Sequence, residues 1–365
     1  MQTNLTKVVI FNPSIEDGGV EKNLFIITNY LAERIKELYL ITTSIEQLKN
    51  FSSKVKIILP LIKIAKKRKR YIRYFFSILE LLKFIIKNKN VLIVSFQANI
   101  YALIIAYIFN VKIISRSNTA PNGWSKNFLK QKVFNFFLKK ANLIVVNSYE
   151  FKKIMDSKFK INCKCILNPF NFERIKYLSS IKSKNIIFSK DKKVLRLINV
   201  GRLVDQKDQL TILKALKIVI KKRKVKLIIV GKGENEINLR RFIKYNGLSD
   251  CVKLIGYQKN PYNYIKAADV FILSSVYEGS PNVLIEAQYL KKYIISTNCP
   301  TGPKEILMNG RYGDLYPVGD FNKLAKLIIS YKFDKNKVQS GFKSLKKYEE
   351  KKSCEEYLRT INSYI

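Results

Sequence analysis

The chain has 365 residues, of which 68 are basic and 27 acidic, so its formal net charge is +41. This length exceeds the usual size of one hydrophobic core and favours two domains. Because 47 % of the residues are hydrophobic, the composition excludes a disordered basic tail. The five cysteines form an odd set without two paired spacings, which argues against a disulfide framework or a structural zinc site.

Short apolar runs recur along the chain, and a segment with helical periodicity follows each of them. In the first half the runs are KVVIF, LYLITT, VLIVSF, VKIIS and LIVVNS, and in the second half LRLINVG, VKLIIVG, VKLIGY, DVFILSS and YIISTN. Apolar strands that alternate with helices are typical of parallel sheets covered on both faces. The sequence therefore predicts an α/β protein with two Rossmann-like, doubly wound domains that face each other across a cleft.

A polar, lysine-rich and serine-rich segment separates the two series of strands. We expect an N-terminal domain over 1–178, a C-terminal domain over 179–345, and a last helix in 346–365 that packs back on the N-terminal domain. The longest apolar stretch, 91–109, is interrupted by Ser95, Gln97 and Asn99, so it reads as strand, turn and helix and not as a membrane span. No secretion signal is recognised at the N-terminus, and a cytoplasmic location is expected.

The positive charge raises the question of nucleic-acid binding. It is spread over the whole chain, however, and the aromatic residues lie mainly in apolar segments, so no nucleic-acid partner is predicted. One run, Ala65–Phe76, combines five basic residues before its first tyrosine with several aromatic ones. This run fits either an anionic membrane surface or a solvated loop and helix face.

Two loops place glycine or basic residues where a strand gives way to a helix. In FNPSIEDGGVEKN, Gly19 lies at the expected start of a helix, where backbone amides attract an anion, although an ordinary turn explains the pattern equally. In NVGRLVDQKDQ, Arg202 and Lys207 follow a strand, and Asp208 is the expected N-cap of the next helix. Both cations can stabilise a departing diphosphate, or they are two of many surface charges.

The segment SSVYEGSPNVLIEAQ contains two carboxylates around a helix start. Ser280 is the expected N-cap and Pro281 the first helical residue, which places Glu278 in the loop and Glu286 inside the helix. Ionised carboxylates accept hydrogen bonds from vicinal hydroxyl groups, as in a ribose or a hexose. The alternative is one loop charge and one helix-surface charge.

In order and spacing, the second half resembles the retaining glycosyltransferases of family 4, which have the GT-B fold. The resemblance rests on NVGRLVDQKD, IIVGKGE, VKLIGYQKN, AADVFILSSVYEGSPNVLIEAQ and STNCPTGPKEIL, and more loosely on GGVEKN near the start. It covers nearly the whole chain and is strongest over 195–318. The segment CPTGPKEIL, with Glu305, looks most like bacterial glycan-assembly enzymes that use UDP-N-acetylhexosamines, notably N-acetylgalactosaminyltransferases.

The resemblance implies a role for each matching residue. Arg202 and Lys207 would hold the nucleotide diphosphate, Glu286 the ribose and Glu278 the donor sugar. The catalytic set would be Glu278, Arg202 and Lys207. Backbone groups of Gly19, Asn282, Val283 and Leu284 would line the phosphates, and Gly256 and Tyr257 would neighbour the base.

One departure from the family concerns the first domain. Members commonly have a histidine near the transferred sugar, whereas this chain contains no histidine. Arg116, Ser117 or Asn118 in IISRSNTAP would then take over its hydrogen bond, and Glu305 is a further candidate for contact with the acceptor.

The resemblance implies transfer of a hexose or N-acetylhexosamine, with retention, from a UDP-sugar to a saccharide or lipid-linked saccharide in surface glycan synthesis at the inner face of the membrane. No cofactor and no metal are expected, because the chain has no Asp-x-Asp motif and Arg202 and Lys207 would replace the cation. The alternatives are a nucleotide-sugar epimerase or hydrolase of the same fold and a basic nucleic-acid-binding protein.

Overall fold

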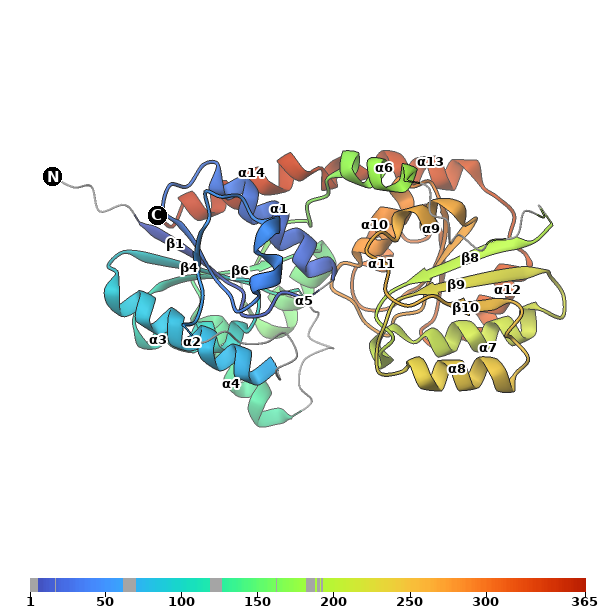
Figure 1. The fold of residues 1–365 in the computed structure, drawn as a ribbon, viewed down its shortest axis with the longest axis horizontal. Coiled ribbons are helices and arrows are strands. Elements are labelled where there is room, and N and C mark those ends of the chain that lie inside the picture. The colour runs from blue at the N-terminus through green and yellow to red at the C-terminus, as the bar shows by residue number, and fades with distance from the viewer. Residues whose placement is uncertain are drawn as a thin grey trace. The chain divides into compact units, whose positions relative to one another are not determined.

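A computed structural model of the chain describes residues 6–16, 18–61, 70–118, 127–161, 163–181, 188, 191 and 193–365. The chain divides into two compact units, Met1–Phe170 with Tyr348–Ile365, and Asn171–Lys347. The division lies before the boundary expected at 178, because helix α6 (Phe172–Ser180) packs against α9 (Tyr262–Ala267) of the second unit. Figure 1 shows the elements of each unit.

The described part of the first unit contains a seven-stranded sheet in the order β3-β2-β1-β4-β5-β6-β7. All its neighbouring strands run parallel. The strands are β1 Lys7–Phe11, β2 Leu38–Ile41, β3 Lys56–Ile58, β4 Val91–Ser95, β5 Lys112–Arg116, β6 Leu143–Val146 and β7 Cys163–Cys165. The five apolar runs of the first half are five of these strands.

Helices of the first unit connect and cover these strands. They are α1 Gly19–Ala32, α2 Arg70–Lys87, α3 Asn99–Ile108, α4 Phe128–Lys139, α5 Tyr149–Phe159 and α14 Glu350–Asn362, with a 3-10 turn at Ile45–Asn50. Helix α14 lies beside α1 (Figure 1) and buries Cys354, Tyr357 and Ile361 in the same apolar cluster as Leu24 and Leu31. The last helix of the chain thus completes the core of the first unit.

The second unit has a six-stranded parallel sheet in the order β10-β9-β8-β11-β12-β13. Its strands are β8 Leu195–Val200, β9 Val225–Val230, β10 Val252–Leu254, β11 Val270–Leu273, β12 Tyr293–Thr297 and β13 Asp314–Tyr316. Two wholly parallel sheets confirm the predicted α/β class, since the apolar runs of both halves pair as buried strands.

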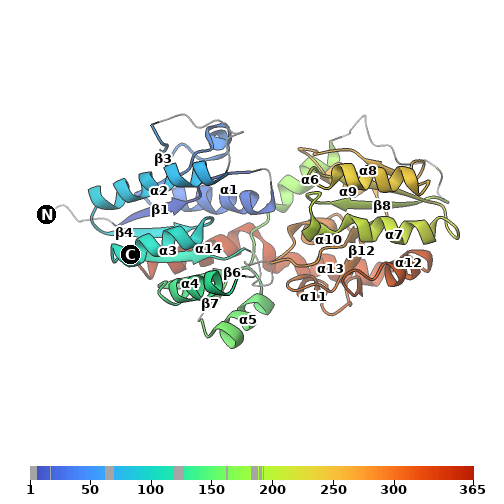
Figure 2. The same ribbon diagram turned by 90° about the horizontal axis from the view of Figure 1, so that it is seen from below.

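Helices cover both faces of the second sheet, as Figures 1 and 2 show. Beyond α6 and α9 they are α7 Gln209–Val219, α8 Glu236–Tyr245, α10 Asn282–Tyr289, α11 Pro303–Ile306, α12 Phe321–Ile329 and α13 Lys335–Lys343, with 3-10 turns at Asp205–Lys207 and Ser344–Tyr348. Helix α7 packs against α8 and α12, whereas α10 packs against α9, α11 and α13.

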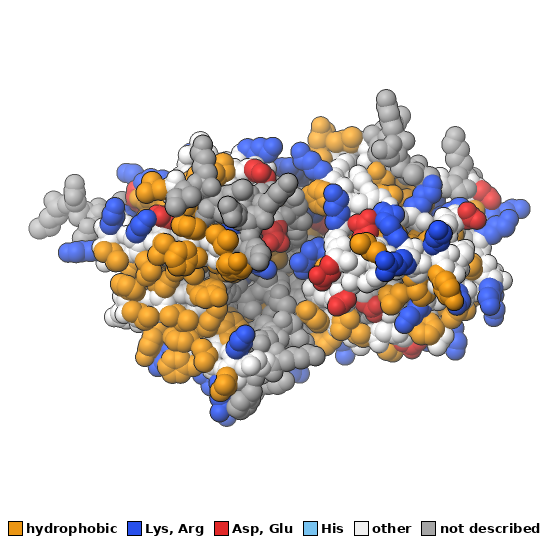
Figure 3. Space-filling model, turned by 60° about the horizontal axis from the view of Figure 1, so that its bottom comes forward, with side chains coloured by type: hydrophobic (Ala, Val, Ile, Leu, Met, Phe, Trp, Pro, Cys, Tyr) orange, Lys and Arg blue, Asp and Glu red, His pale blue; other side chains and the backbone are white. Residues whose placement is uncertain are grey.

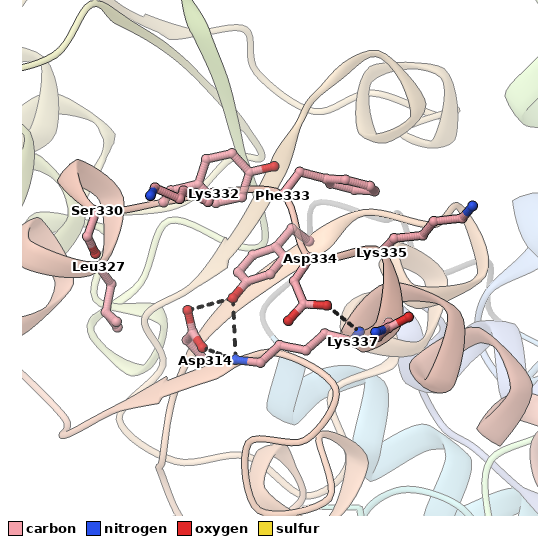
Figure 4. A pocket seen from close by; sticks show the side chains of 11 residues that line it. Asp314, Leu327, Ser330, Lys332, Phe333, Asp334, Lys335 and Lys337 are labelled. Carbon is pink, nitrogen blue, oxygen red and sulfur yellow. Dashed lines mark hydrogen bonds and ion pairs between the residues drawn. The ribbon is translucent and has the colours of Figure 1, made fainter.

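Polar side chains form hydrogen bonds and ion pairs with one another at the amino-terminal edge of the second sheet. Figure 4 shows a pocket there, in which Asp314 accepts hydrogen bonds from the Lys337 ammonium (2.6 Å) and the Tyr293 hydroxyl (2.8 Å). Tyr293 and Asp314 begin β12 and β13, so this pocket lies at the edge opposite the strand ends where open α/β sheets bind ligands. We therefore interpret the network as structural.

At the same edge the Arg196 guanidinium donates two hydrogen bonds to the Asp269 carboxylate, of 3.0 and 2.5 Å. Burial alone would raise the pKa of Asp269, but the hydrogen bonds and the charge of Arg196 outweigh it and hold the pKa below its ordinary value of 3.8. The ion pair connects the start of β8 with the residue before β11.

We expect Asp269→Asn to lower the free energy of unfolding by about 1–2 kcal/mol at neutral pH, because one partner of a charge-assisted hydrogen bond is lost. Because the pKa of Asp269 is lowered in the folded state, its carboxylate stabilises the fold fully above pH 3.8. This stabilisation is lost as the pH falls through the pKa of the folded state. Urea unfolding of both proteins should therefore give a difference that shrinks below pH 3.8. A difference that is unchanged in acid would contradict this assignment.

Candidate functional site

The carboxyl-terminal edge of the second sheet carries a partly buried ion pair. The ammonium group of Lys207 lies 2.5 Å from Oε1 of Glu278, and the hydroxyl of Ser275 donates to the same oxygen at 2.6 Å. The Glu278 residue is only 6 % exposed. Lys207 follows β8 and Glu278 follows β11, which are neighbours in the sheet, so the topology brings together two residues that the sequence placed in separate motifs.

Local structure fixes the position of Lys207. Asp208, in a left-handed conformation with φ 43°, caps α7 by accepting from the amide and the hydroxyl of Thr211 at 3.1 and 2.6 Å. This confirms the predicted N-cap. The side-chain amide of Gln209 also donates to the carbonyl of Arg202 at 3.0 Å, so both ends of this loop are tied to the start of α7.

Hydrogen bonds from both neighbouring loops fix the position of Glu278. The hydroxyl of Ser274 donates to the Lys207 carbonyl at 2.7 Å, on the β8 side. On the β12 side, the backbone amide of Glu278 donates to the Pro300 carbonyl at 2.7 Å, and the Thr301 amide donates back to the Glu278 carbonyl at 3.2 Å. The carboxylate is therefore held on a rigid segment, as a group that orients a substrate must be.

Helix α10 begins one residue later than expected. Its N-cap is Pro281, with an extended ψ of 100°, and its first residue is Asn282. The prediction of Ser280 as N-cap is wrong, because the extended backbone of Pro281 keeps it out of the helix. The amides of Asn282, Val283 and Leu284 form the first turn, where the helix dipole favours an anion.

Glu286 lies inside α10 and is 1 % exposed, so it is not the helix-surface charge that the sequence left open. Its Oε1 accepts a hydrogen bond of 3.0 Å from the hydroxyl of Tyr262 on α9. Tyr262 was missed from the sequence, because PYNYIKAADV marks it only as one of two tyrosines of a short helix. The hydrogen bond fixes the orientation of the carboxylate.

The remaining predicted residues of the second unit lie at or near the same edge. Arg202 directly follows Gly201 at the end of β8; its side chain is exposed and forms no hydrogen bond or ion pair with the described residues. Gly256, with φ +71°, and the 44 % exposed Tyr257 follow β10. Glu305 lies half-buried on α11. The structure thus pairs Lys207 with Glu278 and leaves the Arg202 side chain facing solvent.

The glycines of IIVGKGE are required because the backbone of this loop lies directly against the backbone of the loop after β8. A Cβ atom on Gly231 would lie 1.8 Å from the Gly201 carbonyl oxygen, and one on Gly233 would lie 2.2 Å from that of Leu203. Any side chain there would push the loop after β9 away from the loop that carries Arg202. These glycines therefore shape the edge without contributing functional groups.

The predicted residues of the first unit lie at the carboxyl ends of its strands. Gly19 is the first residue of α1. The 1 % exposed Arg116 donates to Oδ1 of Asn168 at 2.6 Å, and its guanidinium carbon lies 5.2 Å from the centre of the Phe96 ring and 5.9 Å from that of Tyr357. Arg116 thus helps to attach α14 to the sheet, and its contact with a sugar stays a prediction.

The side chain of Asn118 is held by a neighbouring backbone group. Its amide donates to the Phe96 carbonyl at 3.1 Å.

Two buried cysteines have raised pKa values. Burial, reinforced by the charge of Glu278, raises the pKa of the Cys299 thiol to about 12, so the thiol next to the ion pair stays protonated. Burial likewise raises the pKa of Cys163 on edge strand β7 to about 12.

Two further properties concern metals and membranes. Within the described ranges, no group of three or more cysteine, aspartate or glutamate side chains is arranged to hold a metal ion. None of the helices in the described part of the chain is both long and apolar enough to cross a bilayer. The Ala65–Lys69 part of the predicted membrane-contact run lies outside the described residues, whereas its end forms the start of α2.

Residues 181–351 match the family described as glycosyl transferases group 1. The amylovoran biosynthesis glycosyltransferase AmsD of Erwinia amylovora is 30 % identical over 282 residues, which cover 74 % of this chain and 78 % of AmsD. A Methanocaldococcus jannaschii protein named as an uncharacterized glycosyltransferase, MJ1059, is 36 % identical over 206 residues, 54 % of this chain. This chain spans 51 % of that protein.

A third relative is a Campylobacter jejuni enzyme named N-acetylgalactosamine-N,N'-diacetylbacillosaminyl-diphospho-undecaprenol 4-alpha-N-acetylgalactosaminyltransferase. It is 29 % identical over 234 residues, 61 % of this chain and 62 % of the enzyme. Among solved structures, Anabaena Alr3699/HepE in complex with UDP and glucose superimposes with a TM-score of 0.79 and 17 % identity, over 98 % of this chain and 100 % of that one. The chain therefore belongs to the group 1 glycosyltransferases, and its fold is GT-B.

Proposed function

We propose that the protein transfers a hexose or N-acetylhexosamine, with retention, from a UDP-sugar to a saccharide or lipid-linked saccharide in surface glycan synthesis. The observation that carries this proposal is the Lys207–Glu278 ion pair at the carboxyl edge of the second sheet, followed by α10 with its buried Glu286. The name of the Campylobacter relative, with its acceptor on undecaprenyl diphosphate, supports an N-acetylgalactosamine donor and a lipid-linked acceptor. The UDP complex of HepE supports a uridine nucleotide.

In this proposal Glu286 binds the ribose hydroxyls of the nucleotide. A charged acceptor forms stronger hydrogen bonds than a neutral one, and Tyr262 already orients this carboxylate, which reduces the entropy lost on binding. Because Glu286 is 1 % exposed, the side chains that cover it must move before the ribose can reach it. The amides of Asn282 and Val283 in the first turn of the same helix would bind a phosphate, whereas the Leu284 amide donates to the Pro281 carbonyl at 3.0 Å.

Lys207 and Arg202 would stabilise the departing diphosphate, and Glu278 would bind hydroxyl groups of the donor sugar. An ammonium group has three donors, so Lys207 can keep its bond to Glu278 and donate to a phosphate oxygen at the same time. The pair therefore links the leaving group to the sugar-binding carboxylate. Removing one fixed donor to developing charge typically slows turnover by about 100-fold or more.

The chemical step replaces one bond at the anomeric carbon by another on the same face. The bond from C1 to the UDP oxygen breaks, the acceptor hydroxyl oxygen bonds to C1, and its proton passes to the departing phosphate oxygen. No histidine is required for this step, which fits a chain that contains none. The protein's own contribution is to hold the sugar and to stabilise the negative charge that develops on the diphosphate.

We expect Glu286→Gln to weaken UDP binding by about tenfold or more, because it removes the charge from a buried hydrogen-bond acceptor. Isothermal titration with UDP measures the loss, and UDP-induced thermal shifts give an independent reading. Asp250→Asn, at an exposed turn before β10, is the matched control and should bind UDP normally. Equal affinity of the Glu286 variant and the wild type would remove this residue from the site.

For Glu278→Gln we expect UDP affinity near that of the wild type and turnover reduced by about 100-fold, because the sugar loses its charged acceptor and Lys207 loses its partner. Lys207→Met should weaken both UDP binding and turnover. The two effects on turnover should not add in the double variant, since the side chains form one pair. Full turnover of the Glu278 variant, or additive losses, would contradict the assigned roles.

We propose that transfer needs no divalent cation, because Lys207 and Arg202 supply the positive charge. Purified protein incubated with UDP-N-acetylgalactosamine and a saccharide acceptor should form the same α-linked product with EDTA as without it, as NMR of the anomeric proton would show. Loss of transfer in EDTA and recovery with Mg²⁺ would refute metal independence and leave the proposed transferase activity intact. Release of free sugar or a C2 epimer without any acceptor would instead favour the hydrolase or epimerase.

A further inference from the structure

Helices α2, α3 and α4 of the first unit expose an unusual number of large apolar side chains. Figure 3 shows hydrophobic side chains gathered on the face that these helices form. Seven of them have exposed fractions between 48 % and 71 %: Tyr71 and Phe75 of α2, Tyr107 and Ile108 of α3, and Leu129, Val133 and Phe136 of α4. We refer to this surface as the α2–α4 face. Contiguous exposed apolar surface of this kind marks an interaction site.

The apolar side chains form one surface across the three helices. Tyr74 of α2 contacts Tyr101 of α3 with ring centres 6.3 Å apart, and Tyr107 of α3 contacts Phe136 of α4 at 5.9 Å. On α4, Leu129 and Phe136 are separated by two helical turns and therefore share one side of the helix. Helix α3 lies between the other two and joins their exposed faces.

Lysine side chains lie beside the apolar side chains, on α4 and directly after it. Helix α3 contains no charged residue, and α4 contains three lysines and no acidic residue. The one acidic residue of α2, Glu80, is paired with Lys83. Next to α4, the Lys140 ammonium lies 5.9 Å from the Tyr107 ring centre and 5.5 Å from that of Phe136. Aromatic and aliphatic groups bordered by lysine match the interface of an anionic bilayer.

A second copy of the chain fits this surface less well. An isologous dimer would bring two such faces together, and the lysines of α4 would find no acidic partner there, because α3 and α4 contain no acidic residue and Glu80 of α2 is paired with Lys83. Lipid phosphates at the rim would neutralise these lysines, while the acyl-chain boundary would accept the apolar residues. Charge complementarity therefore favours the bilayer over self-association.

We propose that the α2–α4 face binds the surface of an anionic bilayer, with Ile108, Leu129 and Phe136 inserted among the lipids. This surface includes Tyr71 and Phe75 from the run Ala65–Phe76 expected from the sequence, but most of its exposed apolar residues come from α3 and α4. The proposal rests on the proposed function only in that a lipid-linked acceptor would lie in the same membrane. Vesicle binding is measured without sugar nucleotide, so that each can fail independently of the other.

The test compares the full-length protein with a triple variant, Ile108→Ser, Leu129→Ser and Phe136→Ser. In sedimentation with vesicles of phosphatidylcholine and phosphatidylglycerol at 3:1, the wild type should bind, and the variant should bind at least about tenfold more weakly. The matched control, Ile237→Ser, Tyr245→Ser and Phe333→Ser, changes three exposed apolar residues of the second unit and should bind like the wild type. Circular dichroism melting establishes that both variants fold.

Three further measurements, of transfer activity, of vesicle binding in high salt and of oligomeric state, distinguish insertion into a bilayer from the alternatives. Transfer to a water-soluble saccharide should be unchanged in the triple variant, because its three positions lie outside the site. Equal vesicle binding by the variant and the wild type would overturn the proposal. If both proteins also lost their binding alike in high salt, the lysines alone would account for the binding. A wild-type dimer that the triple variant converts to a monomer, with no vesicle binding by either, would also overturn it and assign the face to self-association.

Discussion

Parallel strand direction is the constraint on which the candidate site depends. In a wholly parallel sheet every strand ends at the same edge, so loops that are far apart in sequence become neighbours. Lys207 and Glu278 are separated by 71 residues and yet lie 2.5 Å apart, because β8 and β11 are adjacent. The same rule places Pro300, after β12, where its carbonyl fixes the backbone of Glu278. Three loops thus form one rigid group of polar residues.

Burying carboxylates is costly, and this chain has only 27 acidic residues, so their partners are informative. Glu278 has a cation and a hydroxyl group, Lys207 and Ser275. Glu286 has the hydroxyl of Tyr262. The first carboxylate is coupled to a group suited to bind phosphate, whereas the second is oriented from another helix. The roles proposed from the family resemblance, the sugar for Glu278 and the ribose for Glu286, fit this difference in environment.

The first unit combines a polar sheet edge with an apolar helical surface. At the edge, Arg116 is buried between Phe96 and Tyr357, so the last helix of the chain is part of the surroundings of the residues that follow β5. On the outside, α3 presents aromatic and aliphatic side chains without any charge. Transfer to an acceptor carried by a lipid would use both features of this unit, the edge for the saccharide and the helices for the bilayer.

The sequence by itself determined the fold class, the ten apolar strands, the N-cap Asp208 and the order of the motifs, because periodicity, capping and loop chemistry are local properties. It did not indicate β3, β7 and β13, which are edge strands of three residues each. Only the tertiary structure decided which side chains meet, such as Lys207 with Glu278 and Tyr262 with Glu286. Such contacts depend on strand order and helix packing, which no local pattern encodes.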